Sequence, residues 1–455
     1  MTSASQVGIV GGGLAGSLLG ILCARRGLRP IIVERDASFD EPATAHGRSI
    51  NLALAARGIE ALRYAGVLAE IEPLLLPMAG RRVHEDGTER FLPYGQRRDE
   101  RIYSVARAGL GRRLFEIARD RFGVEYRFRH ECAGMTAAGT AQIRSPQDVY
   151  ELKTSFLVGA DGAGSAVRRA LEAAGAVRAT EDMLDHGYKE LTLAATPAGE
   201  FALAPEALHI WPRGNFMLIA LPNVDRTFTA TLFLALKGRP SFASVGADVR
   251  SFFVAHFADA LPLIPKLESE YNAHPVGRLG TLTCAPWSHL GRVLLIGDAA
   301  HAIVPFHGQG MNAAFEDCVE LDRLLGEHGS DWARICAEFE RRRTGNAAAI
   351  AAMALENYRE MRDDVRNPKF RLKTEVAFEL ERRHAEFIPR YAMVMFHPEI
   401  SYAEARRRGA VQAEILELLT QNARALDDVD FKRAAELIDE RLGGRSYPQN
   451  PSVGV

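Results

Sequence analysis

A glycine-rich segment near the start of the chain has the residues and spacing of a dinucleotide site. The segment VGIVGGGLAGSLLG covers residues 7–20. Its pattern is G-x-G-x-x-G, with the glycines at Gly11, Gly13 and Gly16. There the first glycine turns the chain, the second lets backbone approach a pyrophosphate, and the third lets a helix pack on a strand. We expect a buried strand over Gln6–Val10, then a helix whose first N–H groups, from Leu14 and Ala15, face phosphates.

An acidic residue follows at the distance that this motif requires. The apolar run at 30–33 predicts a second strand, and it ends in Glu34, 18 residues beyond Gly16. A carboxylate in that position accepts hydrogen bonds from ribose hydroxyls, and Arg35 stands beside it. The motif alone does not distinguish FAD from NAD.

Two later segments favour FAD. FLVGADGAGSAVR at 156–168 predicts a strand and a helix joined by a loop with Asp161, which is suited to cap the helix, and Gly162. VLLIGDAAHAIVPFHGQGMN at 293–312 predicts another buried strand, and Asp298 at its end suits the ribityl hydroxyls of FAD. A helix beginning after this loop would stabilise negative charge on a reduced flavin ring. Its first residues are Gly310, Met311 and Asn312. Bound FAD would make the chemistry redox.

The length and composition of the chain limit which kinds of protein it could be. A chain of 455 residues should form two or three lobes. The net charge of −2 gives no electrostatic case for nucleic acid. No CxxC pair occurs among the five cysteines, so we expect reduced thiols and neither disulfides nor a metal site. Because we find no signal peptide and no long apolar stretch, we expect a cytoplasmic protein without a membrane anchor. The sequence leaves open whether it forms a homodimer.

Together, the three segments resemble the class A flavoprotein aromatic hydroxylases, the group like p-hydroxybenzoate hydroxylase. The resemblance covers most of residues 7–320. It implies an α/β (α+β) fold, in which an FAD-binding Rossmann-like domain accompanies a β-sheet substrate domain and a C-terminal helical region. In this family NAD(P)H visits transiently without a domain of its own. FAD, NADPH and O2 are therefore the expected cofactor and co-substrates, although no site for a 2′-phosphate is evident that would distinguish NADPH from NADH.

More specific stretches resemble those family members that hydroxylate L-kynurenine. They are GRSINLALAARG at 47–58, PYGQRRDERIYSVAR at 93–107, HGYKEL at 186–191, HIWPRGNFMLIALPN at 209–223, ENYREMRDDV at 356–365 and FIPRYAMV at 387–394. The resemblance implies conversion of L-kynurenine to 3-hydroxy-L-kynurenine through a flavin C4a-hydroperoxide, in tryptophan catabolism. The protein would orient the substrate ring and exclude water, with no dedicated acid or base.

The resemblance also assigns substrate contacts. Arg81 and Tyr94 match a pair that binds the substrate carboxylate, although Arg82 adjoins Arg81 and remains an alternative. Asn357 and Tyr391 match the other amino-acid contacts, and Met361 follows Asn357 by one helical turn. It assigns further FAD contacts to Arg48, Ala53, Arg107 and Cys132.

An apolar pocket is expected for the substrate ring. In FMLIALP three apolar residues alternate, so they share one face of a strand: Met217, Ile219 and Leu221. With Phe233 from a later strand they would form a wall of the pocket, although packing on an ordinary core explains the pattern equally well. Phe306 and His307 adjoin the flavin loop, and we expect them to cover the ring, with a positional role for His307.

The domain boundaries follow from where these segments fall. Residues 1–72, 103–180 and 285–355 should form the FAD-binding domain. Residues 73–102 and 181–284 should form the β-sheet substrate domain. Residues 356–455 should be helical, with a disordered tail at 443–455, and helices within 410–442 could cover the active site as a lid.

Three other functions stay open at this point. A related hydroxylase could act on another aromatic acid, such as anthranilate or salicylate, but would not need Asn357 with Tyr391. A flavin-dependent halogenase would need a WxWxIP motif, and none is found. A flavin-binding module without activity would leave the substrate-pocket residues unexplained.

Overall fold

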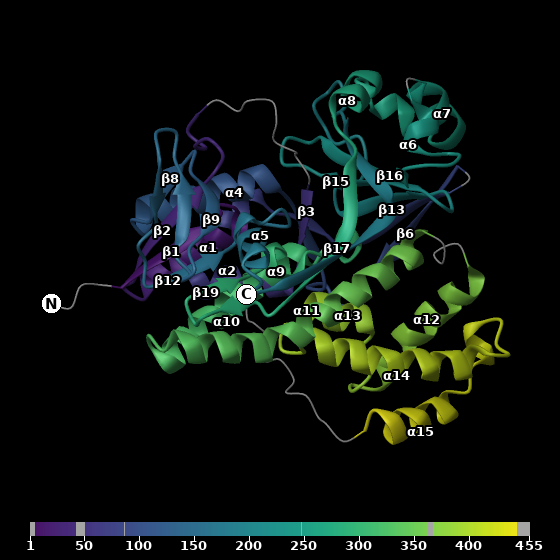
Figure 1. The fold of residues 1–455 in the computed structure, drawn as a ribbon. Helices are drawn as coiled ribbons and strands as arrows, with labels where there is room; N and C mark the ends of the chain where they lie inside the picture. Colours follow the sequence, from purple (N-terminus) through teal and green to yellow (C-terminus); the bar gives the residue numbers. More distant parts are fainter. Residues whose placement is uncertain (1–4, 42–50, 86, 247, 363–366, 444–455) are drawn as a thin grey trace.

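Two large β-sheets stand next to each other in the computed structural model, and the C-terminal helices lie beneath them (Figure 1). The structure describes residues 5–41, 51–85, 87–246, 248–362 and 367–443. Arg48 and most of the predicted tail at 443–455 therefore lie outside the described residues. The mixture of helices and strands is the α/β fold class that the sequence predicted.

The first sheet brings the three glycine-rich segments together. Its six strands have the order β18-β19-β12-β1-β2-β8, and the neighbours from β19 to β8 pair in parallel. The strands are β1 (Gln6–Val10), β2 (Arg29–Glu34), β8 (Glu125–Phe128), β12 (Phe156–Gly159), β18 (Ser288–His289) and β19 (Val293–Leu295). Each glycine-rich segment begins with one of three adjacent strands, β1, β12 and β19. Because parallel strands end at the same sheet edge, their loops meet there.

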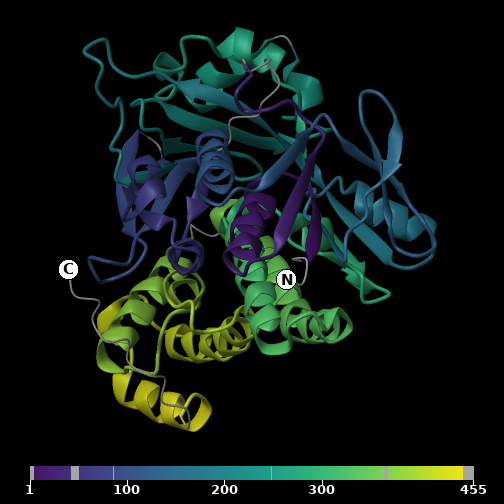
Figure 2. The ribbon, with the colours of Figure 1, turned by 90° about the vertical axis from the view of Figure 1, so that its left-hand side faces the viewer.

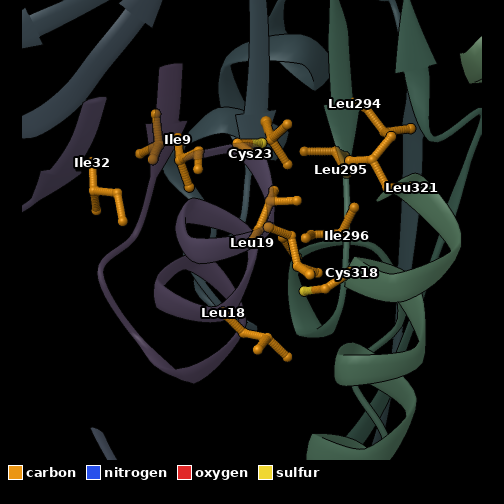
Figure 3. Close-up of a cluster of buried hydrophobic side chains, with 14 of the residues drawn as sticks. Ile9, Leu18, Leu19, Cys23, Ile32, Leu294, Leu295, Ile296, Cys318 and Leu321 are labelled. Atoms are coloured by element: carbon orange, nitrogen blue, oxygen red, sulfur yellow. The ribbon is translucent and has the colours of Figure 1, made fainter. Parts of the chain in front are cut away.

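A buried apolar cluster holds this sheet against helices α1 (Leu14–Arg25) and α10 (Gly310–His328). Figure 3 shows Leu19 of α1 next to Cys318 of α10 and below the strand residues, with Leu18 farther down on the same helix. Gly16 makes the close packing possible, since a Cβ there would lie 1.9 Å from the carbonyl oxygen of Gly11. Gly11 itself has φ +105°, which favours glycine. The glycine pattern is thus required by local geometry.

The second sheet has seven strands in the order β17-β13-β16-β15-β14-β5-β6. They are β5 (Gly80–Glu85), β6 (Thr88–Pro93), β13 (Arg178–Leu193), β14 (Ala207–Pro212), β15 (Met217–Pro222), β16 (Phe228–Ala235) and β17 (Gly277–Ala285). One face packs on the helices α6 (Phe242–Val245), α7 (Val249–His256) and α8 (Leu267–Ala273), at the top of Figure 1. Along β16, Phe228, Ala230 and Leu232 point into that core, while Thr229, Thr231 and Phe233 line a cavity on the opposite face. Because successive side chains of a strand point to opposite faces of the sheet, alternate residues of β16 lie in the core and on the cavity wall.

The chain ends in a group of helices, green to yellow in Figures 1 and 2. They are α11 (Trp332–Arg362), α12 (Pro368–Arg383), α13 (Arg390–Phe396), α14 (Tyr402–Thr420) and α15 (Phe431–Arg441). Helix α11 runs without interruption through the predicted boundary at 355/356, and the domain limits stay a prediction. Helices α12, α14 and α15 share an apolar cluster of their own.

Short elements complete the fold. Two three-stranded sheets are formed by β3 (Asn51–Leu54), β7 (Ile102–Ala106) and β4 (Leu76–Met78), and by β9 (Glu131–Met135), β10 (Ala141–Arg144) and β11 (Val149–Glu151). The remaining α-helices are α2 (Ala56–Ala65), α3 (Leu68–Ile71), α4 (Arg107–Glu116), α5 (Ala166–Ala173) and α9 (Asp298–His301). Within the described part of the chain, none of the helices combines the length and apolar character needed to span a bilayer.

A buried histidine pair lies on the face of the second sheet away from the cavity. His84 Nε2 lies 2.8 Å from His209 Nδ1, and His209 Nε2 lies 2.9 Å from the carbonyl oxygen of Ala204. The His84 ring stacks on Trp211 at 4.2 Å between ring centroids. Burial lowers the pKa of His84 and lowers the pKa of His209 to about 4, so both rings stay neutral in the folded protein.

Acid is therefore expected to destabilise the protein through His209. Below pH 6.5 the unfolded chain binds a proton that the folded chain does not bind until about pH 4, so stability falls as pH falls through this window. A shift of this size corresponds to about 2 kcal/mol lost between pH 7.5 and pH 5. Urea unfolding at each pH, for the wild type and His209→Gln, measures it. Equal pH dependence in both proteins would contradict the assignment.

Candidate active site

A cavity of about 1290 Å³ extends from the ends of β1, β2 and β12 to the inner face of the seven-stranded sheet. Both sheets contribute to its wall, and so do the loop before α10 and the helices α11 and α13. Predicted FAD contacts line one part: Gly11, Gly13, Leu14, Ala15, Glu34, Arg35, Ala53, Arg107, Cys132, Asp161, Gly162, Asp298, Gly310 and Met311. Predicted substrate contacts line the other: Arg81, Tyr94, Ile219, Leu221, Phe233, Phe306, His307, Met361 and Tyr391. One continuous space thus connects the two groups.

The dinucleotide end is shaped by the loop between β1 and α1. Among the described residues, no side chain hydrogen-bonds the N-terminus of α1, so its first N–H groups could bind an anion. A Cβ at Gly13 would meet no atom within 4 Å, so the loop leaves open space where a pyrophosphate would lie. Glu34 Oε2 accepts from the Gly12 N–H at 2.6 Å and Oε1 from the Asp36 N–H at 2.9 Å. Glu34 is thereby held at the cavity wall, where it could accept hydrogen bonds from ribose hydroxyls.

Two aspartates mark the middle of the cavity. Asp161 caps α5, as the sequence predicted, because its carboxylate accepts from the backbone N–H of Ala166 at 2.6 Å and of Val167 at 3.2 Å. Asp298 is exposed to the cavity but enclosed by protein, and burial raises its pKa. It is placed to accept hydrogen bonds from a polyol chain. Among the described residues, these features fit FAD: a phosphate cradle, a ribose acceptor and a polyol acceptor along one cavity.

A buried charge network positions the Asp298 loop. Asp317 of α10 accepts from the Gly297 N–H at 2.9 Å, from His301 Nε2 at 2.6 Å and from Arg343 Nε at 2.7 Å. Burial alone would raise the pKa of Asp317, but the charges of His301 and Arg343 hold it to about 2. The ionised Asp317 therefore fixes the turn that precedes Asp298.

Two predicted FAD contacts, Gly16 and Asn312, do not line the cavity but pack behind residues that do. Gly16 packs against Gly11, as described above. The Asn312 amide donates to the carbonyl oxygens of Ala53 at 2.9 Å and Gly308 at 2.8 Å and accepts from the Ala55 N–H at 3.0 Å. Asn312 thus ties strand β3 to the loop before α10, and the N-terminus of α10 still faces the cavity through Gly310 and Met311.

At the far end, Arg81 lies beside two tyrosines, Tyr94 and Tyr391. Its guanidinium carbon is 5.6 Å from the Tyr94 ring centre and 5.0 Å from the Tyr391 ring centre, and the two rings stack. Burial raises the pKa of both phenols, so both remain neutral donors. Arg81 Nε is buried and makes no hydrogen bond with the described protein atoms. Such a guanidinium with neighbouring hydroxyls is suited to a carboxylate.

Arg81 and Arg82 are neighbours in strand β5, but their side chains lie on opposite faces of the sheet. Consecutive residues of a strand point to opposite faces, and here Arg81 faces the cavity. Arg82 instead pairs with Glu89 and, at 3.1 Å, with Glu206. The structure thus places Arg81, and not Arg82, on the cavity.

The ring pocket is apolar. Ile219 and Leu221 line it with Phe233, and Phe306 stacks on Tyr358 at 4.1 Å. Met217 shares the strand face of Ile219 but is fully buried behind the wall. Asn357 also lies behind the wall, where its amide donates to the carbonyl oxygen of Phe306 at 2.6 Å. The contacts that the sequence assigned to Met217 and Asn357 stay predictions.

His307 is enclosed beside Tyr391, with its ring stacked at 5.6 Å. Burial lowers the pKa of His307 to about 3, so the ring is neutral at physiological pH. A neutral, fully enclosed imidazole agrees with a positional role.

Comparisons with known proteins identify the family. The FAD binding domain family matches residues 4–352. Kynurenine 3-monooxygenase from Stenotrophomonas maltophilia (strain K279a) is 45% identical over 444 residues, which cover 96% of this chain and 97% of the relative. The enzyme of the same name from Myxococcus xanthus (strain DK1622) is 43% identical over 96% of this chain and 95% of the relative. The chain belongs to the kynurenine 3-monooxygenases. It is therefore an FAD-dependent monooxygenase.

Solved structures show the same fold at low sequence identity. p-Nitrophenol 4-monooxygenase from Pseudomonas putida DLL-E4 superposes with a TM-score of 0.67 at 17% identity, over 89% of this chain and 99% of that one. Aklavinone-11 hydroxylase, solved with FAD and aklavinone, gives a TM-score of 0.64 at 22% identity, over 80% of this chain and 70% of that one. FAD, when bound, supplies the redox chemistry of this monooxygenase, and the cavity residues described above would hold it.

Several wall residues of this monooxygenase were not foreseen in the sequence. They are Tyr188, Leu208, Thr229, Thr231, Leu279 and Met395. Tyr188 lies in the specific stretch HGYKEL and could have been found there. The two threonines alternate with core residues in the predicted strand, but the pattern alone does not say which face the cavity covers.

The last described wall residue in the chain is Met395 of α13, so the predicted lid at 410–442 does not reach the cavity wall.

Arg57 of α2 is a buried arginine that connects α2 to the end of α13, and the sequence analysis did not identify it. Its guanidinium donates to the carbonyl oxygens of Met393, Val394, His397 and Ile400 at the end of α13. It also pairs with Glu316 at 2.7 Å and stacks over the Tyr402 ring at 4.1 Å. Arg57 therefore caps the helix that carries Tyr391 and Met395 into the cavity.

We expect Arg57→Gln to loosen α13 and to uncouple the reaction. Removing one partner of a buried ion pair costs about 3–5 kcal/mol in stability. Because Tyr391 would be less well held, water would enter and a larger share of the oxidised NADPH would end as peroxide. Urea unfolding and peroxide formed per NADPH measure both effects. Arg63→Gln, which removes an exposed partner of Glu60 on the same helix, is the control. Lost stability with unchanged coupling would limit Arg57 to a structural role.

Proposed function

We propose that this monooxygenase inserts one atom of O2 into the ring of L-kynurenine at carbon 3, with NADPH as the reductant. L-Kynurenine, NADPH, a proton and O2 would give 3-hydroxy-L-kynurenine, NADP⁺ and water. The observation that carries the proposal is the buried Arg81 beside Tyr94 and Tyr391, in the same cavity as the apolar residues and the predicted FAD contacts. The names of the two bacterial relatives support it.

Different residues of the site would bind the carboxylate and the ring of the substrate. Arg81 and the Tyr94 hydroxyl would bind the carboxylate, which sets how deep the substrate enters. Ile219, Leu221 and Phe233 would hold the ring in an apolar setting. The ring amino group makes the adjacent carbon electron-rich, so the protein needs to orient that carbon and exclude water rather than to supply a base.

A hydroxylase of another aromatic acid is the second candidate. Arg81 could bind the carboxylate of anthranilate or salicylate as well. In those acids the carboxylate is attached directly to the ring, so a molecule bound at Arg81 would place its ring beside Tyr94 and Tyr391. L-Kynurenine has a side chain between ring and carboxylate, so its ring would reach farther along the cavity from Arg81 toward the apolar residues.

The rate of NADPH oxidation by the FAD-loaded protein tests the proposal. L-Kynurenine should stimulate oxidation strongly and perturb the flavin absorbance, while anthranilate and salicylate should do neither. Stronger stimulation by either of those acids, with hydroxylated product, would favour the second candidate. No response to any of the three would reject the proposed substrate.

A further inference from the structure

A threonine hydroxyl lies in the largely apolar wall of the ring pocket. Thr231 of β16 lines the cavity between Thr229 and Phe233, which share its face of the strand, and only 8% of the residue is exposed. Its backbone pairs with that of Ile219 in β15. On the other side it pairs with Glu190 of β13, which lines a second cavity. Thr231 thus brings a polar group among the residues that would hold the substrate ring.

The two threonines on this face of β16 differ in their hydrogen bonds. Thr229 Oγ1 accepts from Asn223 Nδ2 at 3.1 Å and donates to Asn51 Oδ1 at 3.2 Å. Among the described residues, the Thr231 hydroxyl has no such partner. A buried polar group without a hydrogen bond is costly, so such groups are usually satisfied by protein, water or a ligand. The Thr231 hydroxyl is therefore available to a ligand in the cavity.

The place of Thr231 in the sheet fits the ring of a substrate that is held at Arg81. One row of paired residues runs across β5, β14, β15 and β16: Val83, Ile210, Ile219 and Thr231. Neighbouring strands lie about 4.8 Å apart, so β16 is roughly 14 Å from β5, where Arg81 lies two residues before Val83. The long arginine side chain and the carbon chain of L-kynurenine together can span this separation. A carboxylate bound at Arg81 would therefore leave the ring near Ile219 and Thr231.

The ring of L-kynurenine carries one group that such a hydroxyl can bind. The ring amino group has N–H donors, and a threonine oxygen accepts. The ketone lies outside the ring on the way to the carboxylate, and so closer to Arg81. A hydrogen bond from the amino group to Thr231 would also fix how the ring is turned about its bond to the ketone. A ring turned over would move both the amino group and the carbon that is hydroxylated, and Thr231 would lose its partner.

We propose that the Thr231 hydroxyl binds the ring amino group of the substrate, and thereby selects aminated rings and orients the carbon to be hydroxylated. The inference rests on the proposed function, since it takes L-kynurenine as the substrate. It adds a specificity-determining contact at the ring, in the same cavity as the carboxylate contact at Arg81. No proton is moved in this role, because the hydroxyl only accepts a hydrogen bond and leaves the electrons of the amino nitrogen to the ring.

The test compares two ligands that differ only in the ring amino group. They are L-kynurenine and L-2-amino-4-oxo-4-phenylbutanoate, which keeps the ring, the ketone and the whole amino-acid end. The readout is the ratio of their dissociation constants, taken from the flavin absorbance of the FAD-loaded protein. Comparing this ratio between variants isolates the contact with the amino group, because a change that only disturbs packing weakens both ligands alike.

We expect Thr231→Val, which removes the hydroxyl and keeps the shape of the side chain, to lower the preference for L-kynurenine roughly three- to tenfold. Thr231→Ser keeps a hydroxyl and should retain most of the preference. The control is Thr283→Val at an exposed position of β17 in the same sheet, where the ratio should stay at the wild-type value.

An unchanged ratio in Thr231→Val would overturn this role. Equal weakening of both ligands would place the hydroxyl at the ketone or in packing, and no weakening would leave it without a contact. A loss in Thr231→Ser as large as in Thr231→Val would also overturn it. All these results leave L-kynurenine in place as the substrate. If L-kynurenine does not bind the wild-type protein, the proposed function fails, and this inference fails with it.

Discussion

Replacing Arg81 by methionine is expected to lower kcat/KM for L-kynurenine by roughly 30- to 4,000-fold. The loss of one partner of a buried, charge-assisted contact costs about 2–5 kcal/mol, and about 1.4 kcal/mol is tenfold. Methionine fills a similar volume without charge, so packing against Tyr94 and Tyr391 is largely kept. FAD content should stay at the wild-type level because Arg81 lies at the substrate end of the cavity.

The neighbouring arginine provides a matched control for this substitution. Arg82→Met removes the same charge one residue along, but from the opposite strand face, where Arg82 pairs with Glu89 and Glu206. We expect kcat/KM for Arg82→Met to stay within about twofold of wild type, because exposed ion pairs contribute little. Similar losses in the two variants would show that Arg81 has no special place in substrate binding.

Adding one methyl group at Gly13 or at Gly16 should weaken FAD binding for two different reasons. At Gly16 the Cβ would lie 1.9 Å from the Gly11 carbonyl oxygen, so the loop and helix α1 must shift. Both apoprotein stability, by about 1–3 kcal/mol, and FAD binding should then fall. At Gly13 φ is −71° and no atom lies within 4 Å of the Cβ, so the apoprotein should be as stable as wild type.

Only FAD would meet the methyl group at Gly13. We expect the dissociation constant for FAD to rise about 10- to 100-fold in Gly13→Ala, since the backbone can no longer approach the pyrophosphate. Urea unfolding of the apoproteins and titration with FAD separate the two effects. Gly345→Ala in α11, also without an atom within 4 Å, is the control for an added methyl group. Unaltered FAD affinity in Gly13→Ala would mean that the pyrophosphate lies elsewhere.

Local patterns predicted which strands and loops line the cofactor end of the cavity. Strands β1, β12 and β19 are short and apolar and lead into loops that contain glycine, and in a parallel sheet such strands end at one edge. Glu34 and Asp298 follow from their places at strand ends. The sequence did not reveal the loop-holding role of Asn312, because its partners, Ala53 and Ala55, are more than 250 residues away in the chain.

The substrate end of the cavity was harder to predict from the sequence, because the places of its residues depend on tertiary structure. An alternating strand shows that Met217 and Ile219 share a face, but the cavity covers Ile219 only, since Met217 is closed off by apolar neighbours. Adjacent arginines in β5 could not be separated without knowing which face of the strand is covered. Arg57 gave no signal, because an arginine in a helix is usually exposed and its carbonyl partners lie more than 330 residues away.

The measurement that tests the central claim most directly is the yield of 3-hydroxy-L-kynurenine per NADPH oxidised, with ¹⁸O2 as the oxygen source. The account predicts a yield close to one and one ¹⁸O atom in each product molecule, because the cavity would hold the ring beside the flavin and keep water from it. Oxidation of NADPH that yields only peroxide, or product without ¹⁸O, would contradict it.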